Sequence, residues 1–208
     1  MPYEEGGFRQ KAQQRYYAVM ETVARPFVAA GISPNHITLM GLGFSLVAGI
    51  LFAMGLIFLG GMFLWFSALM DPIDGTVARL SGKASRFGAL FDSTLDRYAE
   101  FFIFFGFLFH FRDGWMFWVT ALALMGSVMV SYVKARAEGL GQKEFRGLMQ
   151  RPERLILLIA GTVLNAPINS LFAPDCGDCT LQGTIVLLAV LTNFTAVQRL
   201  LHSRNALA

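Results

Sequence analysis

Four aspartates follow an apolar stretch of the sequence and could act together on one ligand. Asp71 and Asp74 are three residues apart, and Asp92 and Asp96 are four residues apart. At these spacings each pair lies on one face of a helix. The segment between the pairs, LSGKASRF, lets the chain reverse, so that the two faces can oppose each other. The sequence therefore predicts that four carboxylates converge at one level.

Carboxylates in so apolar a setting must bind protons, pair with cations or hold metal ions, because buried charge is costly. Oxygen-only ligands suit hard ions such as Mg²⁺ or Mn²⁺. Four carboxylates can hold two such ions about 4 Å apart, an arrangement used for phosphoryl chemistry. The simpler alternative is that the acids are helix-end charges paired with Arg79, Arg86 and Arg97. Helical spacing on two adjacent segments favours the metal site.

Small residues are interleaved with the four acids. Gly75, Ala78 and Gly88 would allow two helices, or a ligand and the backbone, to approach closely. Arg79 lies within about one turn of the acids and could hold a diphosphate. The segment thus combines metal ligands with a site for a phosphorylated molecule.

Membrane helices must position these residues. The chain has 208 residues, of which 55% are hydrophobic and 15% charged, and its mean hydropathy is +0.52. This composition excludes an ordinary soluble domain. Apolar stretches of about 20 residues recur, long enough to cross a bilayer core of roughly 30 Å. We expect an all-α membrane protein with six transmembrane helices, near residues 36–58, 61–80, 87–110, 115–136, 153–172 and 182–202.

An amphipathic surface helix is expected over residues 1–30, followed by a six-helix bundle over residues 31–208 in a single domain. The apolar positions that share one face of the first helix are interleaved with basic residues, as in helices that lie on a membrane. These positions are Phe8, Ala12, Tyr16, Val19 and Val23. A helix that simply packs against the bundle explains the pattern equally well. A tight turn is expected at Leu59–Gly61, between the first two spans.

The placement of lysine and arginine predicts the orientation. The chain has 17 of these residues, and all but Arg112 fall in the two terminal regions or in the junctions after the second and fourth spans. Since cytoplasmic loops are enriched in Lys and Arg, we expect both termini and the carboxylates to face the cytoplasm of a cell membrane. Cys176 and Cys179 lie on the opposite side. They could form a disulfide in an oxidising compartment, whereas two thiols cannot complete a zinc site.

The spacing D-x2-D-G-x2-A-R-x8-G-x3-D-x3-D is met in full from Asp71 to Asp96. This pattern resembles the signature of the CDP-alcohol phosphatidyltransferase family, and the six spans and the surface helix extend the resemblance. It implies that a hydroxyl attacks the lipid-linked phosphorus of CDP-diacylglycerol and that CMP leaves. It also implies that two Mg²⁺ or Mn²⁺ ions neutralise the diphosphate and the developing charge.

The resemblance also implies roles for individual residues. Asp71, Asp74 and Asp92 would bind two divalent ions, with Asp96 contributing to the second ion. Asp96 would also be the catalytic base that takes the proton of the acceptor hydroxyl. The segment PNHIT would help to hold the nucleotide, although Asn35 could equally cap a helix. The residues implied to contact the CDP-linked lipid are Asn35, Thr38, Gly75, Ala78, Arg79, Ser85 and Gly88.

Cations further along the chain indicate the acceptor alcohol. The segments SYVKARAEGLG and RPER place positive charge at the ends of spans, where topology alone explains it less well than in a loop. A phosphorylated acceptor needs such cations, whereas neutral inositol does not. The pattern resembles the branch of the family that makes phosphatidylinositol phosphate in bacteria, and its archaeal archaetidylinositol phosphate counterpart. This resemblance implies that inositol 1-phosphate is bound by Ser131, Lys134, Arg136, Arg154 and Arg199.

Three alternatives stay open. Within the enzyme class, glycerol 3-phosphate could be the acceptor, which would give phosphatidylglycerol phosphate. A divalent-cation transporter would use the four aspartates but leaves the glycines and Arg79 unexplained. A membrane scaffold without catalysis is disfavoured by the same acids. The family further implies a homodimer surrounded by membrane lipid and no nucleic-acid polymer as a partner.

Overall fold

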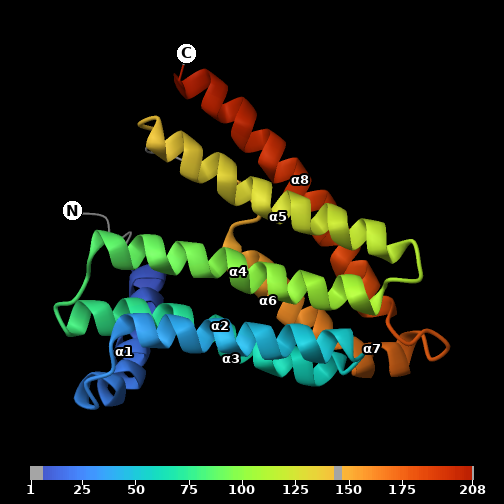
Figure 1. Ribbon diagram of the computed structural model, residues 1–208, viewed down its shortest axis with the longest axis horizontal. Helices are drawn as coiled ribbons and strands as arrows, with labels where there is room; N and C mark the ends of the chain where they lie inside the picture. The colour runs from blue at the N-terminus through green and yellow to red at the C-terminus, as the bar shows by residue number, and fades with distance from the viewer. Residues whose placement is uncertain (1–6, 143–146, 208) are drawn as a thin grey trace. The chain divides into compact units, whose positions relative to one another are not determined.

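The computed structural model describes residues 7–142 and 147–207, and the side chains of residues 7–14, 17 and 205 lie outside this description. The regular structure of the described chain is all-α, which confirms the expected fold class (Figure 1). The helices are α1 Gly7–Ala29, α2 Pro34–Ala53, α3 Ile57–Leu80, α4 Arg86–His110, α5 Met116–Gly139, α6 Arg151–Val163, α7 Asn165–Phe172 and α8 Cys179–Leu207.

The chain is a multi-pass membrane protein with four to five candidate spans among its described residues. Helices α2, α3, α5 and α8 are long and apolar enough to cross a bilayer. Helices α6 and α7 form a pair bent by 55°, and this pair counts as a fifth candidate if it is one span. Helix α4 has 25 residues but carries the charged residues Asp92, Asp96, Arg97 and Glu100. The six expected segments are therefore all helical, but six spans are not shown.

The turn between the first two apolar helices was expected at Leu59–Gly61, and that expectation is wrong. Helix α2 ends at Ala53 and α3 begins at Ile57, so the chain reverses between them. Gly55 lies in this turn with a φ of 78°, which favours glycine. Gly61 lies in α3, where a Cβ atom would come within 2.5 Å of Thr162 Oγ1. Gly60 and Gly61 therefore allow close helix packing and do not form the turn.

By its contacts the chain forms two compact units. The first comprises the described part of Met1–Gly43 and Phe66–Asp96, that is, α1, the start of α2, the end of α3 and the start of α4. In this unit Ser67 Oγ donates a hydrogen bond of 2.9 Å to the Gly41 carbonyl. The expectation of a single domain over residues 1–208 stays a prediction.

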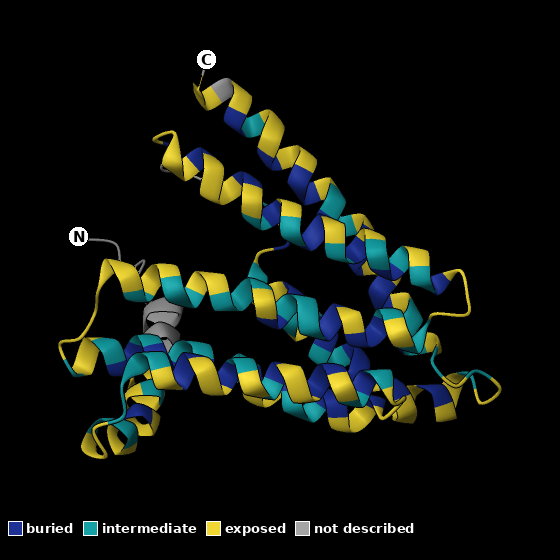
Figure 2. Cartoon of the chain, viewed as in Figure 1, coloured by how far each residue is buried: buried dark blue, intermediate teal, exposed yellow. Residues whose placement is uncertain are grey.

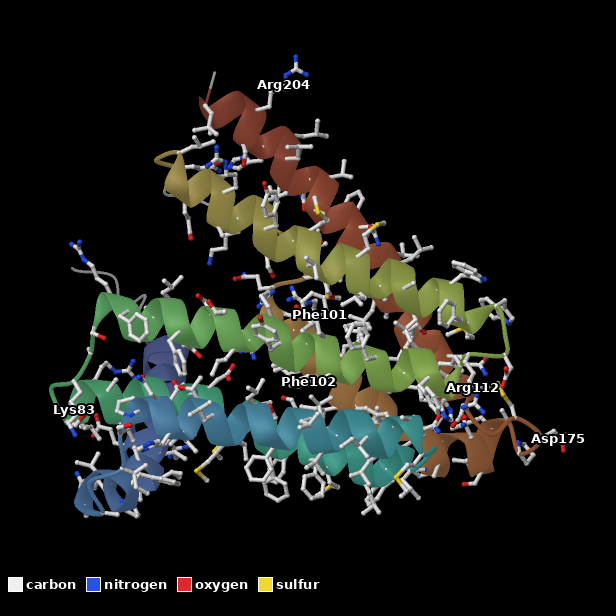
Figure 3. All side chains as sticks on the ribbon, viewed as in Figure 1. Lys83, Phe101, Phe102, Arg112, Asp175 and Arg204 are labelled. Atoms are coloured by element: carbon white, nitrogen blue, oxygen red, sulfur yellow. A yellow bond between two sulfur atoms is a disulfide. The ribbon has the colours of Figure 1, made fainter. Side chains whose placement is uncertain are left out.

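A glycine turn ends α3 and sets the start of α4 in the first unit. Gly82 has a φ of 66°, and Lys83 N donates to the Ala78 carbonyl at 3.0 Å. This is the pattern of a glycine that closes a helix in the left-handed region. Figure 3 labels Lys83 on this turn. The reversal that the sequence predicts between the two pairs of acids is thus present.

The N-terminal helix α1 exposes apolar side chains. Tyr16, Val19 and Val23 are all exposed, whereas Ala24 is fully buried. The other two positions of the expected apolar face, Phe8 and Ala12, lie outside the described side chains. Its location on the membrane surface stays a prediction.

The second unit, Phe44–Trp65 and Arg97–Ala208, contains the apolar core. The rings of Phe52 and Phe107 stack in this core with centroids 4.2 Å apart. Helices α5 and α8 lie side by side (Figure 1). Gly126 permits their contact, because a Cβ atom there would lie 2.2 Å from Thr192 Oγ1. Figure 2 colours much of the remaining surface of these two helices as exposed, which suits a lipid-facing surface.

A hydrogen-bonded loop joins α7 to α8 in the second unit, and Figure 3 labels Asp175 in it. Cys176 and Cys179 form a disulfide in this loop, which answers a question that the sequence leaves open. Asp178 Oδ2 lies 2.9 Å from His110 Nε2, and Asn165 Nδ2 donates to Asp178 Oδ1 at 2.8 Å. The hydrogen bond from His110 holds the pKa of Asp178 below its usual value of 3.8.

Candidate active site

Three of the four motif aspartates meet in the first unit. Asp71 comes from the end of α3, whereas Asp92 and Asp96 come from the first half of α4. One carboxylate oxygen of each lies within 4.8 Å of the other two, and all three residues are partly buried. Among the described residues this cluster could hold a cation. Its oxygen-only ligands fit a hard divalent ion such as Mg²⁺ or Mn²⁺.

Asp74 is not part of that three-carboxylate group, although it lines the same pocket as Asp92. The residue is only 6% exposed, and its Oδ2 accepts a hydrogen bond of 2.7 Å from Thr38 Oγ1. Thr38 was expected to help hold the nucleotide, and in the structure it donates a hydrogen bond to Asp74 of the aspartate motif. The geometry shows one three-carboxylate position, and a second ion held by Asp74 remains an expectation.

A pocket of about 250 Å³ lies beside Asp74 and Asp92 in the first unit. All seven residues that the family resemblance implies for the CDP-linked lipid line this pocket: Asn35, Thr38, Gly75, Ala78, Arg79, Ser85 and Gly88. Side chains from three helices and from the turn before α4 therefore face one space. Its lining includes the basic residues Arg79 and Lys83, which suit the phosphates of a nucleoside diphosphate.

Local contacts explain why the pocket stays open. The Gly88 amide donates to Ser85 Oγ at 3.0 Å, so Ser85 caps the start of α4. A Cβ atom on Gly88 would lie 3.1 Å from that hydroxyl and would fill the space in front of it. Arg79 Nη2 donates to Thr76 Oγ1 at 3.0 Å, which orients the guanidinium along α3. Glycine at position 88 thus lets a ligand reach the backbone.

The alternative role of Asn35 as a helix cap is wrong. Helix α2 begins at Pro34, and Asn35 lies in its first turn. Ser33 precedes the helix, and its Oγ lies 3.2 Å from His36 Nδ1. Because proline is favoured at the first helical position, the cap falls on Ser33 and Asn35 is left facing the pocket.

The residues expected to bind the acceptor phosphate all belong to the second unit, and three of them meet there. Arg154 Nη2 donates to Ser131 Oγ at 3.4 Å, and Arg199 Nη1 donates to the carbonyl of Val130 at 2.8 Å. Arg154 and Arg199 are 2% and 4% exposed. The other two are more open. Lys134 pairs with Glu138 at 3.7 Å, and Arg136 is exposed.

Comparison with known proteins decides the family. The model of the family "CDP-alcohol phosphatidyltransferase" matches residues 31–195, most of the chain. The chain belongs to this family. This match confirms the resemblance that the Asp71–Asp96 motif indicates. It favours the enzyme over a transporter or a scaffold without catalysis.

Several members of the CDP-alcohol phosphatidyltransferase family are similar over nearly their whole length. A phosphatidylinositol phosphate synthase of Mycobacteroides abscessus is 34% identical over 194 residues, which cover 91% of this chain and 85% of that protein. An archaetidylinositol phosphate synthase of Pyrococcus horikoshii is 33% identical over 190 residues, 90% of this chain and 92% of that protein.

Solved structures of one relative add its ligands. The phosphatidylinositol phosphate synthase of Mycobacterium tuberculosis with CDP-DAG bound matches with a TM-score of 0.77 and 34% identity, covering 89% of this chain and 94% of that one. The same relative in complex with manganese and citrate matches with a TM-score of 0.76 and 33% identity, covering 88% of each chain.

Sequence reasoning missed two charged residues, Lys83 and Glu100, near the expected sites of this family member. Lys83 also lines the pocket. Glu100 pairs with Arg154 at 2.9 Å and with Arg97 at 3.1 Å. Lys83 falls between fixed positions of the motif, so spacing gave no signal. Glu100 did carry one, because an ionisable residue in an apolar helix is by default a candidate for function.

Proposed function

We propose that the chain transfers the phosphatidyl group of CDP-diacylglycerol to a hydroxyl of inositol 1-phosphate, releasing CMP and forming phosphatidylinositol phosphate. The observation that carries this proposal is the pocket lined by all seven residues expected to hold the CDP-linked lipid. That pocket shares Asp92 with the carboxylate cluster, so the diphosphate would lie next to the acids. The relatives named for phosphoinositol lipid synthesis support the choice of acceptor.

The bond changes balance without a covalent enzyme intermediate. The acceptor oxygen forms a bond to the lipid-linked phosphorus, and the bond from that phosphorus to the oxygen of CMP breaks. Asp96 takes the proton of the attacking hydroxyl. Arg79 and the backbone at Gly75 and Gly88 hold the diphosphate in place. Asp71, Asp74, Asp92 and Asp96 would hold two Mg²⁺ or Mn²⁺ ions, which when bound neutralise charge on the diphosphate and on departing CMP.

The acceptor's phosphate would be bound by Ser131, Lys134, Arg136, Arg154 and Arg199. Arg154 and Arg199 are buried cations, and guanidinium groups bind phosphate with charge-assisted hydrogen bonds. Glu100 pairs with Arg154, and a phosphorylated acceptor would offset the remaining positive charge, which a neutral acceptor would not. The cations therefore favour a phosphorylated acceptor over inositol or serine.

We further propose six spans, a homodimer, and an orientation with both termini and the active site facing the cytoplasm. Lys and Arg lie almost entirely on the side of the acids. The Cys176–Cys179 disulfide lies in a loop expected on the other side, and disulfides persist in oxidising compartments. The homodimer follows from family resemblance.

One assay tests the reaction and the acceptor together. Purified protein with Mg²⁺ or Mn²⁺ and CDP-diacylglycerol is offered inositol 1-phosphate, inositol, glycerol 3-phosphate or serine, and release of CMP is measured. We expect release with inositol 1-phosphate alone, and none after the metal is chelated. If none of the four acceptors leads to release of CMP, the proposed reaction is overturned. If only glycerol 3-phosphate does, the proposed acceptor is overturned.

A further inference from the structure

Three helices of the second unit bring arginines to a single turn of α5. Arg97 comes from α4, Arg154 from α6 and Arg199 from α8. Arg97 Nη1 and Arg154 Nη2 both donate to Ser131 Oγ. Arg199 Nη1 donates to the carbonyl of the preceding residue, Val130. Three guanidinium groups therefore converge within one turn.

Glu100 links two of these arginines. Its Oε1 accepts from Arg154 Nε at 3.1 Å and from Arg154 Nη2 at 2.9 Å. Its Oε2 lies 3.1 Å from Arg97 Nη1. The side chain of Arg154 is 3% exposed and that of Glu100 is 12% exposed. One carboxylate thus bridges two guanidinium groups in a largely desolvated place.

The bridge fixes where both arginines point. Two guanidinium groups that donate to one hydroxyl repel each other, and the repulsion is strong where water is excluded. Arg154 is held on its other side by the Met149 carbonyl, 3.1 Å from Nη1. Ser131 donates its own hydrogen to the Ser127 carbonyl at 3.2 Å. Glu100 is the carboxylate hydrogen-bonded to Arg154 among the described residues, so its loss would leave the repulsion between the two cations largely unbalanced.

The arginine group carries more positive than negative charge. Among the described residues, Glu100 is the carboxylate paired with Arg97 and Arg154, and Arg199 Nε is buried without a hydrogen-bond partner. A buried polar atom of this kind is normally paired, so the arrangement lacks an acceptor. A phosphate dianion would supply both the charge and the acceptor oxygens.

We propose that Glu100 is a positioning residue of the acceptor-phosphate site. It bridges Arg154 and Arg97 and keeps both guanidinium groups in the orientation in which they receive the phosphate. Glu100 acts through these arginines and does not touch the substrate. This inference rests on the proposed function only in requiring an acceptor that carries a phosphate.

Kinetics of Glu100→Gln test the role. The amide keeps the shape and one acceptor oxygen but loses the charge, so the two arginines move apart. We expect the KM for inositol 1-phosphate to rise about tenfold, roughly the effect of weakening one charge-assisted contact. The KM for CDP-diacylglycerol should stay within about twofold. Glu100→Asp, which restores the charge on a shorter side chain, should recover part of the acceptor KM.

Glu21→Gln is the matched control. It makes the same chemical change at an exposed position of α1, in the first unit and away from the arginine group. It should leave both KM values within about twofold of the wild type, as is usual for exposed charges. A purely structural role for Glu100 would lower the amount of active enzyme and leave both KM values unchanged.

An acceptor KM that is unchanged or lower in folded Glu100→Gln overturns the proposal, and a lower value would mean that Glu100 competes with the phosphate. If Glu100→Gln does not fold, Glu100→Asp decides, because an unchanged acceptor KM there has the same meaning. If the wild type uses glycerol 3-phosphate, the variants are measured with that acceptor. If it releases no CMP at all, the proposed function fails. The shift in Tm caused by inorganic phosphate then tests Glu100, and it should be smaller in Glu100→Gln than in the wild type.

Discussion

Asp74 and Asp96 belong to one sequence motif but have different surroundings. Asp74 is buried and accepts a hydrogen bond from Thr38. Asp96 is only partly buried and lies within reach of Asp71 and Asp92. In the proposed mechanism Asp96 takes the proton of the substrate hydroxyl, a role that partial exposure of its carboxylate permits. Asp74 and Asp96 therefore differ in burial and in hydrogen bonding, and we expect them to have different roles.

Changing Asp96→Asn should abolish turnover and spare most of the binding of the nucleotide. The amide cannot accept the hydroxyl proton, so release of CMP should fall by about two to four orders of magnitude. Binding of CDP, followed by titration calorimetry, should weaken no more than about threefold. Asp113→Asn is the control, because that side chain is 88% exposed. More than about a tenth of wild-type turnover in Asp96→Asn would show that Asp96 is not the base.

The motif predicts which residues gather but not how each is hydrogen-bonded. The seven residues expected around the CDP-linked lipid do line one pocket, because helical spacing fixes which side chains share a face. Asp74 accepts a hydrogen bond from Thr38, 36 positions earlier. Spacing within one motif carries no information about such a distant partner. The same holds for the bridge from Glu100 to Arg154, 54 positions later.

At the scale of the helices, α2 and α4 touch through glycines in the second unit. A Cβ atom on Gly106 would lie 2.2 Å from the Gly49 carbonyl oxygen. A Cβ atom on Gly49 would lie 2.3 Å from the Phe102 carbonyl oxygen. Both obstacles are backbone atoms, which cannot rotate away as a side chain would. Small residues that let backbones approach are the usual basis of helix association in membranes.

Gly106→Ala should therefore destabilise the protein, because the helices must separate to admit the methyl group. The expected cost is about 1–3 kcal/mol, the usual range for overpacking, and it should appear as a lower Tm in detergent. Gly43→Ala is the matched control on α2, where nothing lies within 4 Å of the added atom. That change should be neutral or slightly stabilising, since alanine favours helix. Equal Tm values for the two variants would contradict the close crossing.

Helix positions follow from the apolar pattern, whereas breaks depend on tertiary contacts. The segment expected as one span over residues 153–172 is bent by 55° between α6 and α7. Asn165 lies just after the bend, where its Oδ1 accepts from the Leu181 amide at 3.0 Å. Its Nδ2 donates to Asp178. These partners come from the following loop and helix, so the local sequence of the span could not reveal the bend.

The same loop should make stability depend on pH. Because the His110 hydrogen bond lowers the pKa of Asp178 below 3.8, the folded state is favoured above that value. This contribution is lost as the pH falls through the folded-state pKa. Asp178→Asn should lower Tm at neutral pH and flatten the fall of Tm below about pH 4. Parallel Tm curves for the variant and the wild type below pH 4 would contradict this role.

For the whole molecule, two independent features support the proposed orientation. In the topology expected from the sequence, the Lys and Arg residues other than Arg112 fall in segments assigned to the cytoplasmic side. The disulfide lies in the loop between α7 and α8. The Lys and Arg content of loops determines orientation during membrane insertion, whereas a disulfide depends on the redox state of its compartment. The two features therefore support the orientation for different physical reasons.

Labelling of intact cells with a membrane-impermeant maleimide tests this orientation. After mild reduction, Cys176 and Cys179 should react from outside the cell. Lys83→Cys, made in a variant with both natural cysteines changed to serine, should react only after the membrane is permeabilised. Lys83 lies on an exposed turn, so its accessibility is not limited by burial. Labelling of Lys83→Cys in intact cells would reverse the proposed orientation.

The Cys176–Cys179 bridge closes a loop with a sequence separation of only 3. A loop this short removes little freedom from the unfolded chain, worth roughly 2 kcal/mol in the entropy model. Protein produced in a host without periplasmic thiol oxidants should therefore still insert and fold. Compared with the disulfide-bonded protein, the protein without the disulfide should show faster hydrogen–deuterium exchange only at the start of α8. The amides there donate hydrogen bonds to Asn165 and Asn169. A producer strain can thus be chosen for yield instead of for its oxidising capacity.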